Sequence, residues 1–317
     1  MRFGALLPQA GHAADPDALV EVALAAERCG FDAVWVGDHV LFPASTSDYP
    51  YSTDGSYGVP PDRPFLEAYT TLGYVAAATT TVRLGVSICV APHRPIPLLT
   101  KTVATIDFLS KGRFVLGVAT GWSGQEIGAL GMPFERRGAY TDEALAFTRA
   151  TWATPDGRIS FAGEFTQVDD MYVVPHPPQG QSLPIWVGGA GKAAQRRSAQ
   201  FGSAWHPPLY GLSDDDLRDG IAEVRELAQR YERPQPDAEI DLAVVGEARF
   251  DDGARQLAPG TLNGTPAQIA ERIAQLEEIG ASDIVFLLGG SGRARVAFIE
   301  RFQAEVMPLL SAATIEG

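Results

Sequence analysis

Four short apolar runs in this chain each lead into polar or glycine residues. When such residues follow the carboxyl ends of several buried strands, they gather at one end of a parallel barrel, where barrel enzymes have their active sites. The runs are 33–36 before Gly37-Asp38-His39, 83–86 before Ser87-Ile88, 113–118 before Thr120-Gly121-Trp122, and 184–187 before Gly188-Gly189. The pattern therefore predicts an enzyme.

Strand-like runs alternate with amphipathic helical runs along the whole chain. Eight alternating units can form a closed barrel or an open doubly wound sheet. An open dinucleotide-binding sheet would carry Gly-x-Gly-x-x-Gly after its first strand, but residues 7–12 read LPQAGH. We therefore predict an α/β fold, a single (β/α)8 barrel over residues 1–317 with no linker. The expected strands are 3–7, 33–36, 84–91, 114–119, 185–187, 204–206, 240–245 and 284–288.

Three connections are longer than a barrel needs and are candidates for function. Residues 41–63 are rich in Pro, Gly, Ser and Tyr, residues 154–183 contain a probable hairpin, and residues 247–264 carry two Asp and several Gly. Each can be a surface insertion. Because all three follow strands at the expected catalytic face, we predict that they are lids over the barrel mouth.

The composition excludes several classes of partner and location. The 25 basic and 39 acidic residues give a net charge of −14, so nucleic acid and anionic membranes are not expected as partners. The two cysteines, Cys29 and Cys89, fit a reducing cytosol. No apolar stretch approaches the roughly 20 residues that span a bilayer. We expect a soluble, cytoplasmic protein.

The glycine-rich segment 188–192 lies between an expected strand and an expected helix, 193–201. Backbone N–H groups of such a turn and the helix N-terminus favour a bound anion, and Lys192, Arg196 and Arg197 add cations. Glycine turns of this kind are also common as plain structure. The basic cluster favours phosphate binding.

Asp38 and His39 end the second strand, and Glu126 follows the Thr120-Gly121-Trp122 segment. A histidine at a strand end beside a carboxylate can donate or accept a proton near neutral pH. The alternatives are a hydrogen-bonded His–Asp pair that holds the loop, and a first-turn helix carboxylate for Glu126. The other histidines show no metal-binding spacing, so no metal is predicted, and no Gly-x-Ser-x-Gly segment indicates a serine hydrolase.

Four tryptophans lie on or beside the expected strand ends. One alone would indicate core packing, but several around one barrel mouth favour a flat aromatic ligand. They are Trp35, Trp122, Trp186 and Trp205.

These segments together resemble the luciferase-like monooxygenase superfamily, and most closely its branch of coenzyme F-420-dependent oxidoreductases. The resemblance runs nearly end to end. It rests on residues 30–39 (GFDAVWVGDH), 76–85 (AAATTTVRLG), 107–113 (DFLSKGR), Gly121-Trp122 with Glu126, 130–133 (LGMP), 184–189 (PIWVGG) and 263–266 (NGTP). It implies a barrel that binds flavin mononucleotide (FMN) or the deazaflavin F-420.

The resemblance also implies a role for each matching residue. Ser87-Ile88 falls where relatives carry a non-proline cis peptide that backs the cofactor ring, Thr120 and Gly121 would line the ring edge, and Gly188, Gly189 and Lys192 would hold the phosphate. His39, Asp38 and Glu126 would be catalytic, with His39 handling the proton. Trp122 and Trp205 would line the substrate pocket. Sugar-phosphate dehydrogenases of this group have Glu directly after the Thr-Gly pair, so Trp122 favours a more apolar substrate.

The resemblance leads to three functional hypotheses. The first is hydride transfer between F-420 and a small, fairly apolar organic molecule. The second is monooxygenation with reduced FMN, and the third is a non-catalytic flavin carrier, which the catalytic-type residues disfavour. We also expect a homodimer and a separate reductase that supplies reduced cofactor.

Overall fold

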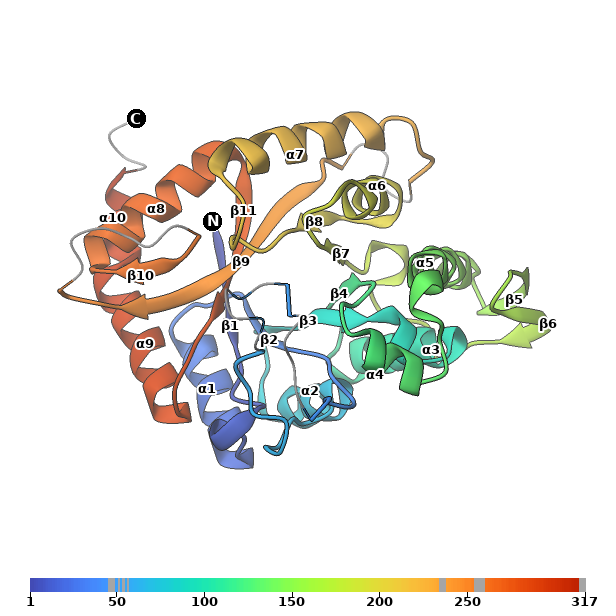
Figure 1. Cartoon of the computed structure of the whole chain (residues 1–317), viewed down its shortest axis with the longest axis horizontal. Helices are drawn as coiled ribbons and strands as arrows, with labels where there is room; N and C mark the ends of the chain where they lie inside the picture. The colour runs from blue at the N-terminus through green and yellow to red at the C-terminus, as the bar shows by residue number, and fades with distance from the viewer. Residues whose placement is uncertain are drawn as a thin grey trace.

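Eight parallel strands close into a barrel, as the sequence predicted. The computed structural model describes residues 1–44, 49–50, 52, 55, 57–233, 238–253 and 260–313. Each strand pairs with the next in the order β1-β2-β3-β4-β7-β8-β9-β11, and β11 pairs with β1 (Figure 1). The barrel strands are β1 (Arg2–Leu6), β2 (Ala33–Val36), β3 (Arg83–Val90), β4 (Phe114–Ala119), β7 (Ile185–Gly188), β8 (Ala204–His206), β9 (Asp241–Phe250) and β11 (Ala281–Leu287).

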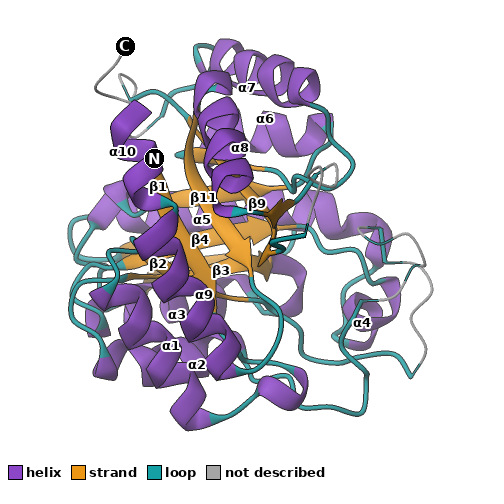
Figure 2. Cartoon of the chain, turned by 90° about the vertical axis from the view of Figure 1, so that its left-hand side faces the viewer, coloured by secondary structure: helices purple, strands orange, loops and turns teal. Residues whose placement is uncertain are grey.

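Helices surround the strands as an outer layer (Figure 2). One long helix lies in each connection between successive barrel strands, and two more follow β11. The helices are α1 (Pro16–Arg28), α2 (Ala68–Ala78), α3 (Ile96–Leu109), α4 (Gly124–Ala129), α5 (Arg137–Ala153), α6 (Lys192–Phe201), α7 (Asp214–Ala228), α8 (Pro266–Ile279), α9 (Gly292–Glu305) and α10 (Met307–Ala313).

Local sequence signals fix the ends of α8. The Thr265 side chain accepts from the backbone N–H of Gln268, whose own side chain accepts from the Thr265 N–H, so two otherwise unpaired donors are satisfied. Pro266 opens the helix, and Gly280 ends it with a φ of 105°, a conformation that favours glycine.

The barrel interior contains a small apolar cluster in which two tryptophans provide most of the volume. The rings of Trp35 and Trp186 lie 4.7 Å apart. A side chain on Gly4 or Gly85 would overlap the Trp35 ring, so these glycines make room for it. Both tryptophans are therefore core residues, and the expectation that they surround the barrel mouth is wrong. The cluster comprises Ala33, Trp35, Val115, Trp186, Ala204, Ala243 and Val285.

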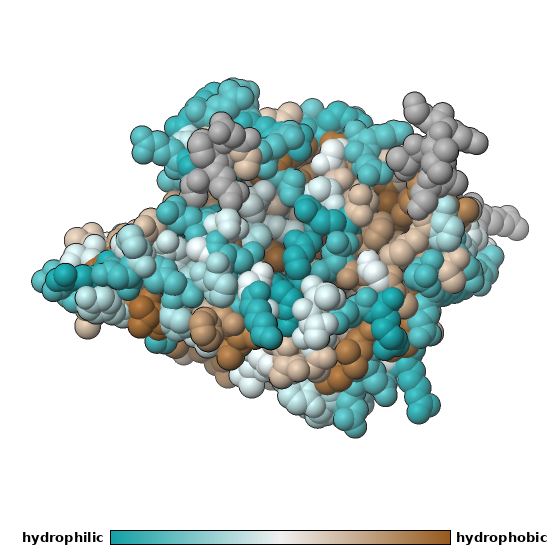
Figure 3. All heavy atoms as spheres, turned by 180° about the vertical axis from the view of Figure 1, so that it is seen from behind, coloured by the Kyte–Doolittle hydropathy of each residue, from teal (hydrophilic) through white to brown (hydrophobic). Residues whose placement is uncertain are grey.

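Two of the three long connections contain regular structure. The predicted hairpin forms from β5 (Arg158–Ala162) and β6 (Gln167–Tyr172), and it packs on α5, where Glu143 accepts from the backbone N–H groups of residues 164–166. This arm projects from the molecule, beside a face on which hydrophilic and hydrophobic residues are mixed (Figures 1 and 3). Residues 247–264 are not simply a loop: β9 continues to Phe250, and β10 (Leu262–Gly264) pairs with it in parallel.

The connection 41–63 contains no helix or strand among its described residues, which exclude 45–48, 51, 53, 54 and 56. Within the described part of the chain, no helix has the length and apolar character to cross a membrane.

Candidate active site

His39 and Glu126, which are 87 positions apart in the sequence, form a buried pair at the carboxyl end of the barrel. His39 follows β2, and its Nδ1 lies 2.7 Å from Oε2 of Glu126 on α4. The other carboxylate oxygen of Glu126 accepts from the backbone N–H groups of Val40 (2.7 Å) and Leu41 (3.1 Å). Ser123 caps α4 at the N–H of Glu126 itself. The sequence predicted both residues as catalytic, and the fold brings them together.

The environment of Glu126 keeps its carboxyl group ionised. Burial alone would raise its pKa, but the hydrogen bond with His39 and the nearby histidines lower the pKa below its usual value. Because an ionised carboxylate can only accept, Nδ1 of His39 carries a hydrogen. This orientation leaves Nε2 of His39 as the nitrogen that can exchange a proton with another molecule.

Asp38 faces away from this pair. Both of its oxygens bind the guanidinium of Arg94, at 2.7 and 2.8 Å, and one also accepts from the N–H of Val90. The Arg94 guanidinium also donates to the carboxylate of Glu67, at 2.8 Å. These bonds tie the end of β2 to the segment after β3. We therefore assign Asp38 a positioning role in place of the predicted catalytic role.

His93 lies between the two buried carboxylates. Its Nε2 is 3.7 Å from Oε2 of Glu126. Its Nδ1 has no hydrogen-bond partner among the described residues and is 3.9 Å from Oδ2 of Asp38. Burial lowers the pKa of His93 despite both carboxylates. The sequence reasoning missed His93 and Arg94 because it considered histidines only for metal spacing. Their position directly after β3 was the available signal.

Aromatic rings surround the His39 imidazole. The centroids of Tyr57, Phe42, Phe65 and Trp122 lie 4.6, 4.7, 5.5 and 5.9 Å from it. Burial raises the pKa of Tyr57, so its hydroxyl stays neutral. Trp122 lies beside His39, as do Phe42 and Tyr57 from the described part of the connection 41–63.

Trp205 lies elsewhere. It points outward from β8 into the helix layer, where its indole N–H donates to the carbonyl of Gly189 at 2.8 Å. A side chain on Gly220 of α7 would overlap its ring. Trp205 is fully buried, and the predicted role in the substrate pocket is replaced by a role in packing.

The Ser87–Ile88 and Gly188–Gly189 segments meet at the same end of the barrel. The Ser87–Ile88 peptide is cis, as the resemblance implied, and the two residues form a bulge where the β3–β4 register shifts. A side chain on Gly188 would overlap Cδ1 of Ile88, so the Ile88 side chain would have to move to accommodate it. Gly189 has a φ of 113°, which allows the sharp turn into α6.

Thr120 and Gly121, which directly follow β4, complete this edge. Both are half-buried, and Gly121 has a φ of 79° and no space for a side chain because Val90 lies against it. The small residues therefore lie on or directly after three neighbouring strands, β3, β4 and β7.

The three predicted phosphate cations each already contact a carboxylate of the protein. Lys192, which is exposed, pairs with Glu223. Arg196 and Arg197 both bind Asp142 at 2.6 Å. What the turn offers to an anion is its backbone: α6 begins at Lys192 without a side-chain cap, so its first N–H groups remain available.

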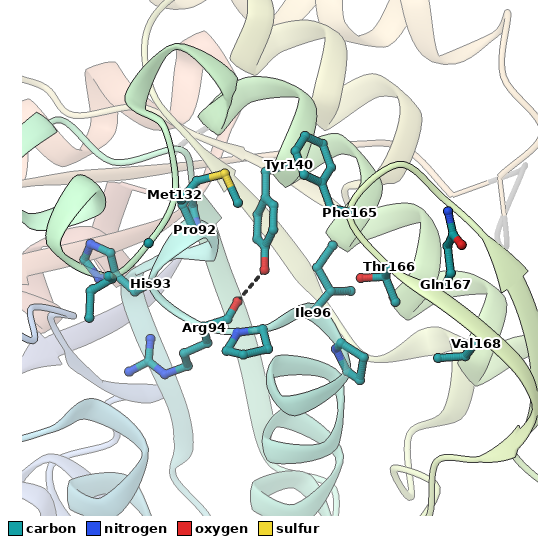
Figure 4. Close-up of a pocket in the computed structure, with 14 residues that line it drawn as sticks. Pro92, His93, Arg94, Ile96, Met132, Tyr140, Phe165, Thr166, Gln167 and Val168 are labelled. Carbon is teal, nitrogen blue, oxygen red and sulfur yellow. Dashed lines mark hydrogen bonds between the residues drawn. The ribbon is translucent and has the colours of Figure 1, made fainter.

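A groove of about 350 Å³ lies beside the charged cluster, between η2 (Ala91–His93), the start of α3 and the β5–β6 arm. At its centre the Tyr140 hydroxyl donates to the carbonyl of Arg94 at 2.8 Å (Figure 4). His93 and Arg94 thus line this groove and also contact the buried carboxylates. No group of three His, Cys, Asp or Glu residues in the described ranges could hold a metal ion.

Comparison with protein families identifies this arrangement. Residues 1–248 match the family model described as luciferase-like monooxygenase. The chain belongs to the luciferase-like monooxygenase family. It is therefore an oxidoreductase that depends on F-420 or FMN.

Individual relatives share between a quarter and a third of their aligned residues with this chain. An uncharacterised protein of Mycobacterium tuberculosis is 31% identical over 241 residues, which cover 75% of this chain and 80% of the relative. An F-420-dependent glucose-6-phosphate dehydrogenase of Microbacterium testaceum is 25% identical, with 93% of this chain and 94% of the relative covered.

Solved structures share the fold at low sequence identity. An F-420-dependent secondary alcohol dehydrogenase in complex with an F-420–acetone adduct superposes with a TM-score of 0.76 at 17% identity, over 98% of each chain. A monooxygenase from Streptomyces bottropensis gives 0.73 at 18% identity, over 97% of this chain and 99% of the other.

Proposed function

We propose that this protein is an F-420-dependent oxidoreductase that transfers a hydride between the cofactor and a small, fairly apolar organic substrate. The observation that carries the proposal is that a buried His39–Glu126 pair and the small-residue edge of Ser87, Thr120 and Gly188 lie at the same end of one barrel. The similarity to F-420-dependent dehydrogenases supports the choice of cofactor.

The residues present fit the cofactor. Ser87, Ile88, Thr120 and Gly121 would line its ring, and the Gly188–Gly189 turn and the first N–H groups of α6 would hold its phosphate, with Lys192 nearby. When bound, the cofactor supplies the hydride donor or acceptor.

The protein would contribute proton handling and a dry, apolar pocket. Glu126 orients His39 so that Nε2 can give a proton to the substrate heteroatom during reduction, or take one during oxidation. The rings of Tyr57 and Trp122 exclude water around that nitrogen. Trp122 stands where sugar-phosphate dehydrogenases have Glu, which favours an apolar substrate.

Reduced-FMN-dependent monooxygenation is the second candidate, because monooxygenases share this fold. Cofactor binding distinguishes the F-420-dependent oxidoreductase from the FMN-dependent monooxygenase. The purified protein is titrated with reduced and oxidised F-420 and with reduced and oxidised FMN, followed by fluorescence. We expect F-420 to bind more tightly. Preferential binding of reduced FMN would support the monooxygenase, and binding of neither would refute both.

His39 is tested once a substrate is found. The His39→Ala variant should lose about 10²- to 10⁴-fold in turnover, the usual contribution of a positioned acid or base. Its affinity for F-420 should stay close to that of the unmodified protein. Unchanged turnover would reject His39 as the proton-handling group.

Two partners belong to the same proposal. A separate reductase would supply the reduced cofactor, and the protein would act as a homodimer, the commonest assembly of soluble enzymes. Sedimentation of the purified protein tests the homodimer. Activity that depends on an added F-420 reductase tests the need for a separate reductase.

A further inference from the structure

His206 is a second buried histidine at this end of the barrel, and it takes no part in the His39–Glu126 pair. It ends β8 and points into the barrel, beside the rings of Trp35 and Trp186 at 6.1 and 5.3 Å. Its Nδ1 lies 2.5 Å from the carbonyl oxygen of Ala243 on β9. Its Nε2 lies 2.9 Å from the hydroxyl oxygen of Ser87 on β3. The imidazole thus bridges the barrel interior.

These two contacts fix the positions of the hydrogens. A carbonyl oxygen can only accept, so Nδ1 of His206 carries a hydrogen and donates it to Ala243. Burial lowers the pKa of His206 to about 4, so the ring is neutral at pH 7 and Nε2 has a bare lone pair. The hydroxyl of Ser87 must therefore donate its single hydrogen to Nε2.

With its hydrogen committed, the Ser87 oxygen has only lone pairs left for any other molecule. Ser87 is half-buried and lies in the β3 bulge, next to Ile88 and the Gly188 turn. This is the edge that the proposed function assigns to the cofactor ring.

We propose that His206 holds the Ser87 hydroxyl as a hydrogen-bond acceptor for the cofactor ring, so that the ring places an N–H group at this point. The inference rests on the proposed function, since it requires a ring at Ser87. Ser87 makes the contact, and His206 is a positioning residue that acts through it.

The consequence is selection of the ring's orientation. Flavin and deazaflavin rings carry both carbonyl oxygens and N–H groups. A carbonyl placed against Ser87 would face lone pairs and lose its hydrogen bond, which is costly in a water-excluded site. A free serine hydroxyl would accept either group, because it can rotate to donate or accept.

The test follows the His206 nitrogens by NMR in the whole protein labelled with ¹⁵N-histidine. The chain has five histidines, and the His206 signals are identified by their loss in His206→Gln. Without ligand, we expect one protonated nitrogen and one hydrogen-bonded bare nitrogen between pH 6 and 8. A doubly protonated ring in that range would overturn the inference.

Oxidised and reduced F-420, with FMN as the second probe, are then added. A ring N–H that donates to Ser87 polarises the hydroxyl and strengthens its hydrogen bond to His206. The ¹⁵N chemical shift of Nε2 should therefore move further toward that of a strongly hydrogen-bonded nitrogen. A move toward the value of an unbonded nitrogen, or no move on binding, would overturn the inference while the proposed function stands. Failure of both cofactors to bind would overturn the two together.

Binding affinities provide an independent readout. Ser87→Ala should weaken F-420 binding about 3- to 10-fold, the contribution of one neutral hydrogen bond. Ser87→Thr keeps the hydroxyl and should restore most of the affinity. Ser203→Ala removes a serine hydroxyl from the residue before β8, at the opposite end of the barrel, and should have no effect. Equal affinities for Ser87→Ala and the unmodified protein would contradict the proposal.

Discussion

His39 and His206 are buried to a similar extent at the same end of the barrel, but they have opposite partners. His39 is 8% exposed and meets an ionised carboxylate, Glu126. His206 is 2% exposed and meets a carbonyl and a hydroxyl. Burial lowers the pKa of His206 and keeps that ring neutral, whereas His39 donates its Nδ1 hydrogen to a carboxylate. The partner therefore decides which histidine can hold and move a proton and which remains a fixed neutral acceptor.

The two histidines also differ in how the fold supports them. The partners of His39 come from segments outside the barrel strands, and ionic bonds hold these segments together: Asp38, Arg94 and Glu67 form one chain of contacts. The partners of His206 are residues of the barrel strands: Ala243 on β9, which pairs with β8, and Ser87 in the bulge of β3. The charged site should therefore be the more sensitive to loss of a single side chain.

The largest expected effect is at Asp38. Asp38→Asn leaves the buried Arg94 without its two-point carboxylate partner, which should lower the free energy of unfolding by about 3–5 kcal/mol. Urea denaturation measures this loss. Asp252→Asn, at an exposed pair with Arg301, is the matched control and should leave stability nearly unchanged. Similar losses in the two variants would contradict the distinction between a buried and an exposed ionic site.

The next effect is a pH dependence that comes from His206. Its pKa is about 4 in the folded protein and 6.5 in the unfolded chain. Between these values the unfolded state binds the proton more readily, so the free energy of unfolding falls as the pH falls, by at most about 3 kcal/mol. His206→Gln should remove this part of the dependence. Parallel stability curves for the two proteins from pH 7 to pH 4 would show that His206 is not held neutral.

Glu126→Gln should have a smaller effect on stability. The change replaces charge-assisted hydrogen bonds from His39, Val40 and Leu41 by neutral ones, at a cost of about 1.5–3 kcal/mol. The pKa of Glu126 is lowered in the folded state, so its contribution is present above its unfolded pKa and is lost as the pH falls through the folded value. The variant should therefore lose less stability on acidification than the unmodified protein does. Equal acid sensitivity would show that the carboxylate is not stabilised by its partners.

Much of the fold was readable from the sequence because its signals are local. The alternation of strand and helix patterns predicted the closed barrel, and Thr265, Gln268 and Gly280 predicted the ends of α8. His39 and Glu126 were each predicted as catalytic candidates at one end of the barrel, since strand ends share one edge, and the fold pairs them.

The errors concern which side of a strand or turn a residue faces. Neighbouring residues on β8 alternate, so Trp205 enters the helix layer while His206 enters the barrel, and the sequence alone did not show which. The partner of Asp38 was also hidden from the sequence, because Arg94 is 56 positions away and only the fold shows that the carboxylate binds it.

The smallest expected effect is at Lys192, the cation predicted to bind phosphate. Its pair with Glu223 is exposed, so Lys192→Ala and Glu223→Ala should each change the free energy of unfolding by less than about 1 kcal/mol. The same variants measure what Lys192 contributes to the affinity for F-420. If the backbone N–H groups of the turn hold the phosphate, F-420 affinity should fall less than about 3-fold in Lys192→Ala at moderate salt.

A different outcome would identify Lys192 as a true phosphate ligand. The lysine would then have to leave Glu223, so Glu223→Ala would strengthen F-420 binding while Lys192→Ala weakened it tenfold or more, and both effects would shrink at high salt. Opposite and salt-sensitive shifts are the result expected if the exposed ion pair competes with the cofactor. Without such shifts, Lys192 would remain paired with Glu223, and the backbone N–H groups of the turn alone would bind the phosphate.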